Sequence, residues 1–255
     1  MNNEAIKPPK SAFRTLLRYE LILAKRTPYS IVLGLAFPVI LLIIFGSIPA
    51  LHQKQAALGN MSYFAVSVPV LIGFAATSTA FMSLPTTLVS YREQGILRRM
   101  STTPVPPMWL LAAQVLVNMG VALFGLILLV VVGISAYGLN TPKNMPGFIV
   151  GSILTLTSVF AVGLWLAAIA RSNTSSKAIG GILFYIVLFF GGLWVPRESM
   201  PPTLLTISNW TPLGASVAAI QNSFQGTFPT WQALECLAGY SIIFFYLAVR
   251  YFNWE

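Results

Sequence analysis

Residues 91–104, Tyr-Arg-Glu-Gln-Gly-Ile-Leu-Arg-Arg-Met-Ser-Thr-Thr-Pro, form a short charged segment between two long apolar runs. The run before the segment, residues 63–89, and the run after it, residues 108–137, contain no charged residue. About 20 apolar residues are enough to cross the hydrocarbon core of a bilayer, so each run predicts a membrane span. The charged segment must then lie at a membrane surface, and its excess of arginine predicts the cytoplasmic side.

The charged segment has the pattern of a short amphipathic helix. Ile96, Leu97 and Met100 are spaced three and four residues apart, as apolar positions on one helix face are, and Pro104 would end the helix. So short a helix is not stable alone in water and needs something to pack against. On these residues alone, two interpretations stay open: a loop that only orients the chain in the membrane, and a helix that docks on another protein.

The composition is that of an integral membrane protein. Of the 255 residues, 56% are hydrophobic and 8% charged, and the mean hydropathy is +0.77, whereas soluble domains carry about 25% charged residues. The net charge of +9 comes from Lys and Arg residues scattered between apolar runs, which favours membrane orientation over nucleic-acid binding. One cysteine, Cys236, one histidine, His52, and no aspartate leave little to bind a metal, and we expect no cofactor on this chain.

Six runs are long and apolar enough to be membrane spans, namely residues 29–48, 63–89, 108–137, 148–170, 178–195 and 233–249. With the N-terminus in the cytoplasm, only Lys54, Lys143 and Arg197 among the basic residues lie outside, in agreement with the positive-inside rule. An even number of spans returns the C-terminus to the cytoplasm. We therefore predict a cytoplasmic leader, residues 1–28, followed by one transmembrane domain, residues 29–255.

Two further helical elements are expected outside the spans. The leader predicts an amphipathic helix lying in the membrane interface, because its apolar positions share one helix face and its basic positions the other; the defining residues are Phe13, Leu16, Leu17, Arg18 and Leu21. Residues 203–224 are too polar for a span that faces lipid, so we expect a re-entrant helix pair that enters the outer leaflet and returns. If they crossed instead, the chain would have seven spans and Arg250 would lie outside.

The ionisable residues bear on mechanism. None falls near the middle of a predicted span, whereas ion-driven transporters usually carry such a group there. Glu235 comes nearest, but Thr230 can cap a helix that starts at Trp231, and the helix dipole favours an acid in its early turns. Arg197 and Glu198 are expected at the outer mouth, where solvent screens their charges. The sequence has no G-x-x-x-x-G-K-[ST] phosphate loop and no nucleophile elbow, so we expect no enzyme activity from this chain.

Two separated motifs resemble a known family. Residues 91–104 resemble the first cytoplasmic loop in permease subunits of type-2 ATP-binding-cassette exporters, where an R-E-x-G-x-L-R-R element is followed by T-P. Residues 196–201, P-R-E-S-M-P, and 209–213, N-W-T-P-L, are similar to the exit of that family's fifth span and to its outer re-entrant region. The chain departs from the pattern at Trp210-Thr211, where the family more often has a shorter apolar residue before the proline.

The resemblance implies a permease subunit of the drug- and antibiotic-export-like branch, in a bacterial inner membrane. It implies two kinds of partner: a separate ATPase subunit, which binds ATP and Mg²⁺, and a second copy or a paralogue of the permease. Residues 91–103 would be a coupling helix that docks on the ATPase through Arg92, Glu93, Gly95, Leu97, Arg98 and Arg99. The leader helix would be the family's connecting helix, and the outer gate would involve Pro196, Glu198, Pro201, Asn209 and Pro212.

Candidate cargo contacts follow from helical spacing in the second and fifth predicted spans. These spans offer aromatic surface with few polar groups, as sites for drug-like molecules do; the candidates are Phe74, Thr77, Phe81, Phe184, Tyr185 and Leu188. We expect export of an apolar or amphiphilic molecule, such as a drug, an antibiotic or a lipid-like compound. Two alternatives remain: an ion-coupled multidrug exporter, which should carry a mid-span acid, and a membrane-embedded scaffold, which should have no ATPase partner.

Overall fold

The computed structural model describes residues 10–26, 28–100 and 105–252, and this part of the chain is almost wholly helical. The α-helices are α1 (Lys10–Arg26), α2 (Pro28–Ser47), α3 (Tyr63–Ser78), α4 (Leu84–Glu93), α5 (Ile96–Met100), α6 (Pro107–Tyr137), α7 (Met145–Ile169), α8 (Asn173–Gly191), α9 (Pro202–Asn209), α10 (Pro212–Gln225) and α11 (Trp231–Tyr251). Short 3₁₀ turns lie at Pro49–His52, Ala56–Leu58 and Arg197–Ser199. Strands β1 (Lys54–Gln55) and β2 (Met61–Ser62) pair antiparallel.

The fold is that of an all-α integral membrane protein, which confirms the prediction from the sequence. Within the described residues, 5 segments are long and apolar enough to cross a membrane, namely Tyr63–Glu93, Met108–Tyr137, Met145–Ile169, Asn173–Gly191 and Trp231–Tyr251. The first predicted span corresponds to α2, whose described apolar part is Gly34–Ser47. The 20 residues of α2 amount to about 30 Å of helix, the thickness of a hydrocarbon core.

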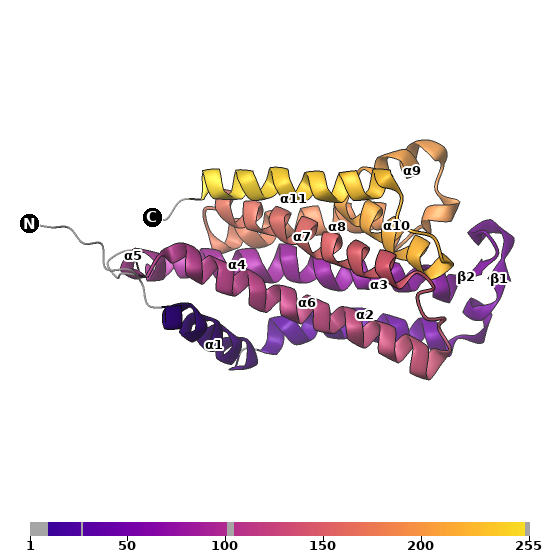
Figure 1. Ribbon diagram of the computed structural model, residues 1–255, viewed down its shortest axis with the longest axis horizontal. Helices are drawn as coiled ribbons and strands as arrows, with labels where there is room; N and C mark the ends of the chain where they lie inside the picture. Colours follow the sequence, from indigo (N-terminus) through magenta and orange to yellow (C-terminus); the bar gives the residue numbers. More distant parts are fainter. Residues whose placement is uncertain (1–9, 27, 101–104, 253–255) are drawn as a thin grey trace, which may run out of the picture.

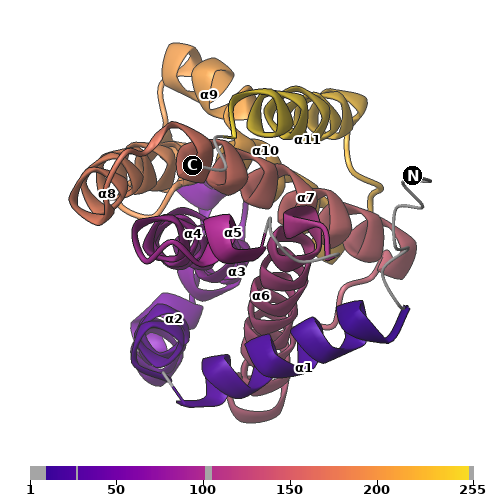
Figure 2. The ribbon, with the colours of Figure 1, turned by 90° about the vertical axis from the view of Figure 1, so that its left-hand side faces the viewer.

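The helices form one elongated bundle (Figure 1). α1 and α5 lie at one end of this bundle, and the two strands and α9 lie at the other. Viewed from the α1 end, α1 runs across the bundle rather than along it, and α3 and α4 lie between α2 and α8 (Figure 2). α11 packs along α7, and α10 packs against α7, α3 and α8. We call the end with α1 and α5 the basic end, because it carries Arg18, Lys25, Arg98 and Arg99.

The second span contains an irregular turn. Between α3 and α4 the chain makes a π-helical turn, Thr79–Ser83, a feature that shifts the helical register and is frequent at functional sites. α7 and α8 cross this turn at Gly163 and Gly180. A Cβ atom at Gly163 would collide with the carbonyl oxygen of Ala80, and one at Gly180 with that of Phe81. Both crossings therefore depend on the absence of a side chain.

Polar caps define where several helices begin. Side-chain oxygens accept a hydrogen bond from a backbone N–H in the first turn of the helix that follows them, at Ser62, Asn144, Ser172, Thr211 and Thr230. The cap at Thr211 separates α9 from α10, which have 8 and 14 residues. Neither helix reaches the roughly 20 residues of a span. The predicted helix pair at residues 203–224 is thus present as two helices, and its depth in a membrane stays a prediction.

The main core lies where α3, α4, α7, α8 and α10 meet. Its largest fully buried side chains include Phe81, Phe160, Leu88 and Leu188. α10 is mostly buried although it contains several polar side chains, and its two serines are satisfied within their own helix. Ser216 Oγ donates to the carbonyl oxygen of Pro212 at 2.6 Å, and Ser223 Oγ to that of Ala219 at 2.9 Å. Such local bonds remove the cost of burying a hydroxyl group.

Candidate functional site

A cavity of about 670 Å³ lies between α2, the α3–α4 span and α8. Four of the six candidate cargo contacts line it, namely Phe74, Phe184, Tyr185 and Leu188. The other two do not: Thr77 is 0% exposed and Phe81 is 1% exposed, and both lie inside the bundle. The π-helical turn accounts for Phe81, because it rotates this residue away from the position that it would have in a regular α-helix. The last two residues of the turn, Met82 and Ser83, line the cavity instead, together with Thr86 of α4.

Aromatic rings form the middle of the cavity wall. The ring of Phe74 is stacked on that of Phe37 from α2 at a centroid distance of 5.2 Å, and meets the ring of Phe184 edge-on, also at 5.2 Å. Phe74 and Phe184 are therefore fixed by packing. Tyr185 is 58% exposed, so it is the predicted aromatic contact with the most surface free for a ligand. Lys177, near the start of α8, adds a positive charge to an otherwise largely apolar lining.

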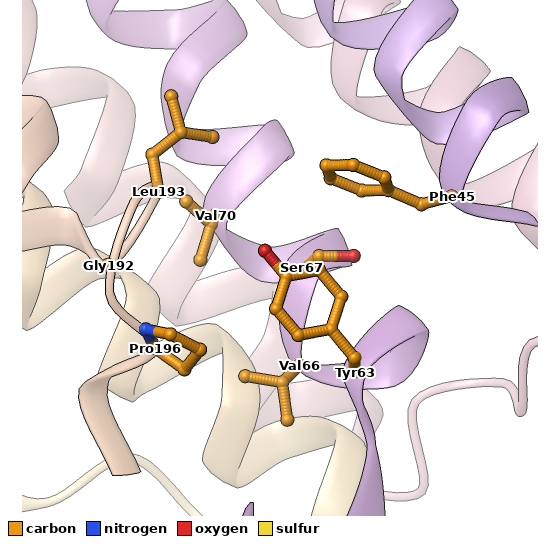
Figure 3. Close-up of a pocket in the computed structure, with 8 residues that line it drawn as sticks. All are labelled: Phe45, Tyr63, Val66, Ser67, Val70, Gly192, Leu193 and Pro196. Carbon is orange, nitrogen blue, oxygen red and sulfur yellow. The ribbon is translucent and has the colours of Figure 1, made fainter. Parts of the chain in front are cut away.

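The bundle is tightly packed beyond this cavity, toward the strands. Eight residues surround a space of only about 10 Å³ (Figure 3): Phe45, Tyr63, Val66, Ser67, Val70, Gly192, Leu193 and Pro196. This is room for about one water molecule. Leu193 lines both this space and the large cavity, so its side chain stands between them. Pro196, a predicted outer-gate residue, lies across the space from Phe45 of α2.

At the basic end, the charged segment is not one continuous helix. α4 ends at Glu93 and α5 begins at Ile96, and Gly95 between them has φ +66°. This left-handed conformation suits glycine and commonly ends a helix. The predicted coupling helix over residues 91–103 is therefore divided in two, with Arg92 and Glu93 in α4 and Leu97, Arg98 and Arg99 in α5. Residues 101–104 lie outside the described part of the chain.

Arg92 and Glu93 make contacts within the chain. The Arg92 guanidinium donates to the carbonyl oxygen of Ala170, between α7 and α8. The Glu93 carboxylate accepts from the backbone N–H of Asn173 at 2.9 Å and from the Asn173 side-chain amide at 2.7 Å. Asn173 is the first residue of α8, where the helix dipole favours a negative charge. The end of α4 is thus joined to the start of α8, a wall of the cavity.

α5 has an inner and an outer face. Leu97 is 1% exposed and belongs to the main core, whereas Arg98 and Arg99 are exposed. One guanidinium nitrogen of Arg99 donates to the carbonyl oxygen of Gln94 at 3.0 Å. Leu97 therefore anchors the short helix, and the two arginines lie at the surface of the basic end.

Comparison with known proteins identifies the family. A family model described as ABC-2 type transporter matches residues 11–224. This chain belongs to the ABC-2 type transporter family. The permease is 23% identical over 180 residues to YvfS of Bacillus subtilis, covering 69% of this chain and 71% of YvfS. It is 26% identical over 190 residues to YhhJ of Escherichia coli, covering 69% of this chain and 48% of YhhJ.

Both relatives are named as transport permeases. The match spans about half the length of YhhJ. Membership of the family makes this chain a transmembrane transport subunit, and the family generally works with a separate ABC ATPase subunit. The resemblance noted in the sequence is thus confirmed for the family, whereas the drug-export branch stays a prediction.

The predicted connecting helix of the permease, α1, is held to the bundle by a polar cluster. Glu20 is 4% exposed, and its carboxylate accepts from Tyr91 Oη at 3.0 and 3.1 Å and from the side-chain amide of Gln114. Asn118 in turn donates to Gln114 Oε1 at 3.0 Å. Burial raises the pKa of Glu20 above its ordinary value, and the hydrogen bond from Tyr91 partly opposes this shift.

The role of Glu20 was not predicted from the sequence, although its position carried a signal. Glu20 follows Leu16 and Leu17 by four and three residues, so it lies on the apolar face of α1. An acid on that face, together with the polar Gln114 and Asn118 inside an apolar span, could have predicted the cluster. Arg18 is exposed, as the amphipathic pattern requires.

The apolar residues of α1 meet several parts of the bundle. Phe13 contacts Trp109 of α6 edge-on, with ring centroids 5.9 Å apart. Leu16 packs against the main core. Leu17 and Leu21 face a separate groove between α1, α2 and α6.

At the opposite end, Arg197 holds the two short helices together. The sequence predicted Arg197 in solvent, but it is 6% exposed. Its guanidinium donates to Ser208 Oγ at 2.7 Å, to Asn209 Oδ1 at 2.5 Å and to the carbonyl oxygen of Gly214. Burial lowers the pKa of Arg197 to about 10, and the negative charge of Glu198 partly opposes this shift. Because this pKa lies above 7, the guanidinium is charged at neutral pH. The sequence could not show that Arg197, in the turn after α8, would be covered by α9 and the start of α10.

The other predicted outer-gate residues surround this arginine. Glu198 accepts a hydrogen bond from the side-chain amide of Gln221 on α10. Pro201 precedes α9, and Pro212 is the buried first residue of α10. Asn209 is the one predicted gate residue that Arg197 binds directly. Together these contacts fasten α9 and the turn after α8 to the buried helix α10.

Proposed function

We propose that this permease is the transmembrane half of an ATP-driven exporter for an apolar or amphiphilic molecule. Two copies of the chain, or this chain and a paralogue, would form the pathway, and two separate ATPase subunits would bind ATP and Mg²⁺. Closure of the ATPases would move the α5 helices together and open the cavity outward by rigid-body motion. The exporter would act in a bacterial inner membrane, with both chain ends in the cytoplasm.

The observation that carries this proposal is the cavity between α2, the α3–α4 span and α8. Its volume of about 670 Å³ and its aromatic walls suit a drug-sized apolar molecule. The surface beside it is also apolar: on α8, Ile182 is 62% exposed and Ile186 is 48% exposed. A second permease copy placed against α8 would enclose the cavity, as the proposed dimer requires.

The contacts at the basic end support coupling between an ATPase and this cavity. Arg98 and Arg99 lie on the outer face of α5, where a partner can reach them. Leu97 connects α5 to the core, and Glu93 joins the adjoining end of α4 to the start of α8. A push on α5 would therefore reach both the α3–α4 wall and the α8 wall of the cavity.

The ion-coupled alternative gains no support from the positions of the carboxylates in the described residues. Glu20 lies in α1, Glu93 ends the second span, and Glu198 lies in the turn after α8. Glu235 is exposed near the start of α11, where Thr230 caps the helix. None of these four positions is at the middle of a span, where a coupling ion is usually bound.

Copurification tests the ATPase partner. We expect the tagged permease, extracted from its native membrane in mild detergent, to bring down an ABC ATPase at nearly equal stoichiometry. The double variant Arg98→Glu, Arg99→Glu should lose it, because reversing two exposed charges opposes docking. Arg171→Glu, an exposed residue between α7 and α8, is the matched control and should retain the ATPase. Capture of no ATPase by the native chain, with its dimer intact, would overturn the proposal and leave α5 as an orienting element.

Dye export tests the cavity. Tyr185→Ala should reduce the export of lipophilic fluorescent dyes several-fold, since it removes an exposed aromatic contact without opening the core. Phe74 and Phe184 are less informative targets, because truncating a buried phenylalanine costs about 3–5 kcal/mol of stability. Tyr246→Ala on α11, where the tyrosine is 59% exposed, is the control. Equal export by wild type and Tyr185→Ala, at equal expression, would exclude this cavity as the cargo site.

A further inference from the structure

A second, larger hollow lies outside the candidate cargo cavity. It is a groove of about 1010 Å³ between α1, α2 and α6, on the side of α2 that faces away from α8. Leu17, Leu21 and Lys25, spaced four residues apart, contribute one face of α1 to it. The walls from α2 and α6 are apolar, with Val39 and Phe124 as examples.

The groove combines a long apolar interior with a positively charged edge. Lys25 is the one charged side chain among its described lining residues, and it is exposed in the last turn of α1. Arg26 follows it and is exposed too. α1 crosses the basic end of the bundle (Figure 2), and Lys25 lies in the last turn of α1. The lining residues outside α1 come from α2 and α6.

The interior of the groove is open at Gly120. A Cβ atom added at this position of α6 would have no neighbouring atom within 4 Å. Phe124, one turn further along α6, is 60% exposed. The groove is therefore an unfilled apolar surface, with room for an apolar chain to lie against α6.

We propose that this groove binds an anionic phospholipid of the cytoplasmic leaflet. One acyl chain lies along α2 and α6, and the headgroup phosphate is held by Lys25 with the help of Arg26. Charge decides the occupant: basic pockets between spans on the cytoplasmic side suit anionic headgroups. A second copy of this chain, with its net charge of +9, offers no such complement to Lys25 and Arg26. The site is separate from the proposed export function, and its test measures binding alone.

Lipid retention provides the test. The purified, delipidated permease is mixed with equal amounts of dioleoylphosphatidylglycerol and dioleoylphosphatidylcholine in micelles, and the retained lipid is identified by native mass spectrometry. We expect preferential retention of phosphatidylglycerol, about fivefold weaker in Lys25→Gln, the effect of one basic residue near an anionic surface. Arg250→Gln, an exposed basic residue in the last turn of α11, should behave as wild type. Glycerol phosphate without acyl chains should not compete.

A second variant fills the interior and leaves the charge unchanged. Gly120→Leu should abolish the retained lipid, whereas Gly239→Leu on α11, where an added Cβ also meets nothing within 4 Å, should not. Equal retention by wild type, Lys25→Gln and Gly120→Leu would overturn the proposal, as would competition by glycerol phosphate. Efficient disulfide crosslinking between two copies of Phe124→Cys in native membranes would assign the groove to a second copy and overturn it too.

Discussion

At the scale of single residues, Glu20 offers a test by pH. Burial raises its pKa, so the folded permease holds this proton more tightly than the unfolded chain, whose carboxyl has the ordinary value of 4.5. The resulting stability is complete below pH 4.5 and is lost as the pH rises through the folded pKa. We therefore expect the unfolding temperature of the wild type in detergent to fall over this interval, and that of Glu20→Gln to fall less.

The control for this prediction is Glu235→Gln. Glu235 is exposed on α11, so its replacement should leave the pH dependence of the unfolding temperature as in wild type. If Glu20→Gln and wild type gave parallel curves across the acidic range, the carboxyl of Glu20 would not be the buried titrating group.

Single residues also show where the sequence was insufficient. The apolar spacing of α1 correctly placed Arg18 at the surface, and the same spacing contained Glu20 as an unrecognised member of the inner face. Arg197 was different, because no local pattern indicates that Ser208, Asn209 and Gly214 will converge on it. Its burial depends on how the turn after α8 folds back onto α10, which is a tertiary property.

At the scale of elements, the π-helical turn of the second span gives a matched pair of mutations. Gly180→Ala would drive a methyl group into the carbonyl oxygen of Phe81, and such overpacking costs about 1–3 kcal/mol of stability. Gly181→Ala, one residue away in α8, meets no atom within 4 Å. It should leave stability unchanged or raise it by about 0.5–1 kcal/mol, since alanine is the better helix former. Thermal unfolding of the two purified variants compares them directly.

Equal unfolding temperatures for Gly180→Ala and Gly181→Ala would mean that α8 moves away from the turn without cost. That outcome would remove the close crossing as a constraint on the register of the second span. The register of the π-helical turn would then no longer explain why Met82, and not Phe81, lines the candidate cavity.

The sequence was a good guide to which elements exist and a poorer guide to their irregularities. Long apolar runs have one stable form in lipid, a helix, because every backbone group must be satisfied internally. The break at Gly95 and the π-helical turn at Thr79–Ser83 were not predicted. The break at Gly95 depends on the conformation of one backbone residue, and the π-helical turn depends on how α7 and α8 pack against it. Neither feature changes the hydrophobic pattern by which a span is identified.

At the scale of the whole molecule, the basic end and the cavity are joined by few polar contacts. α4 and α8 are neighbours in space but are separated in sequence by α5, α6 and α7. At their ends the Glu93 carboxylate and Asn173 form two hydrogen bonds, and Ser90 Oγ accepts a third from the Asn173 amide at 2.9 Å. If two ATPases drive export as proposed, this link carries movement of α4 to the α8 wall of the cavity.

A double-mutant cycle tests this link. We expect Glu93→Ala and Asn173→Ala each to lower dye export per ATP hydrolysed several-fold, while the ATPase still copurifies because Arg98 and Arg99 are intact. The loss in the double variant should be less than the sum of the two single losses, because both single variants remove the hydrogen bond between the Asn173 amide and the Glu93 carboxylate. Asn173→Ala keeps the second bond, from its backbone N–H, so it should be the milder of the two. Purely additive losses would show that Glu93 and Asn173 act separately. Loss of the ATPase from Glu93→Ala would instead assign Glu93 to the docking surface, so copurification and export together decide which role this residue has.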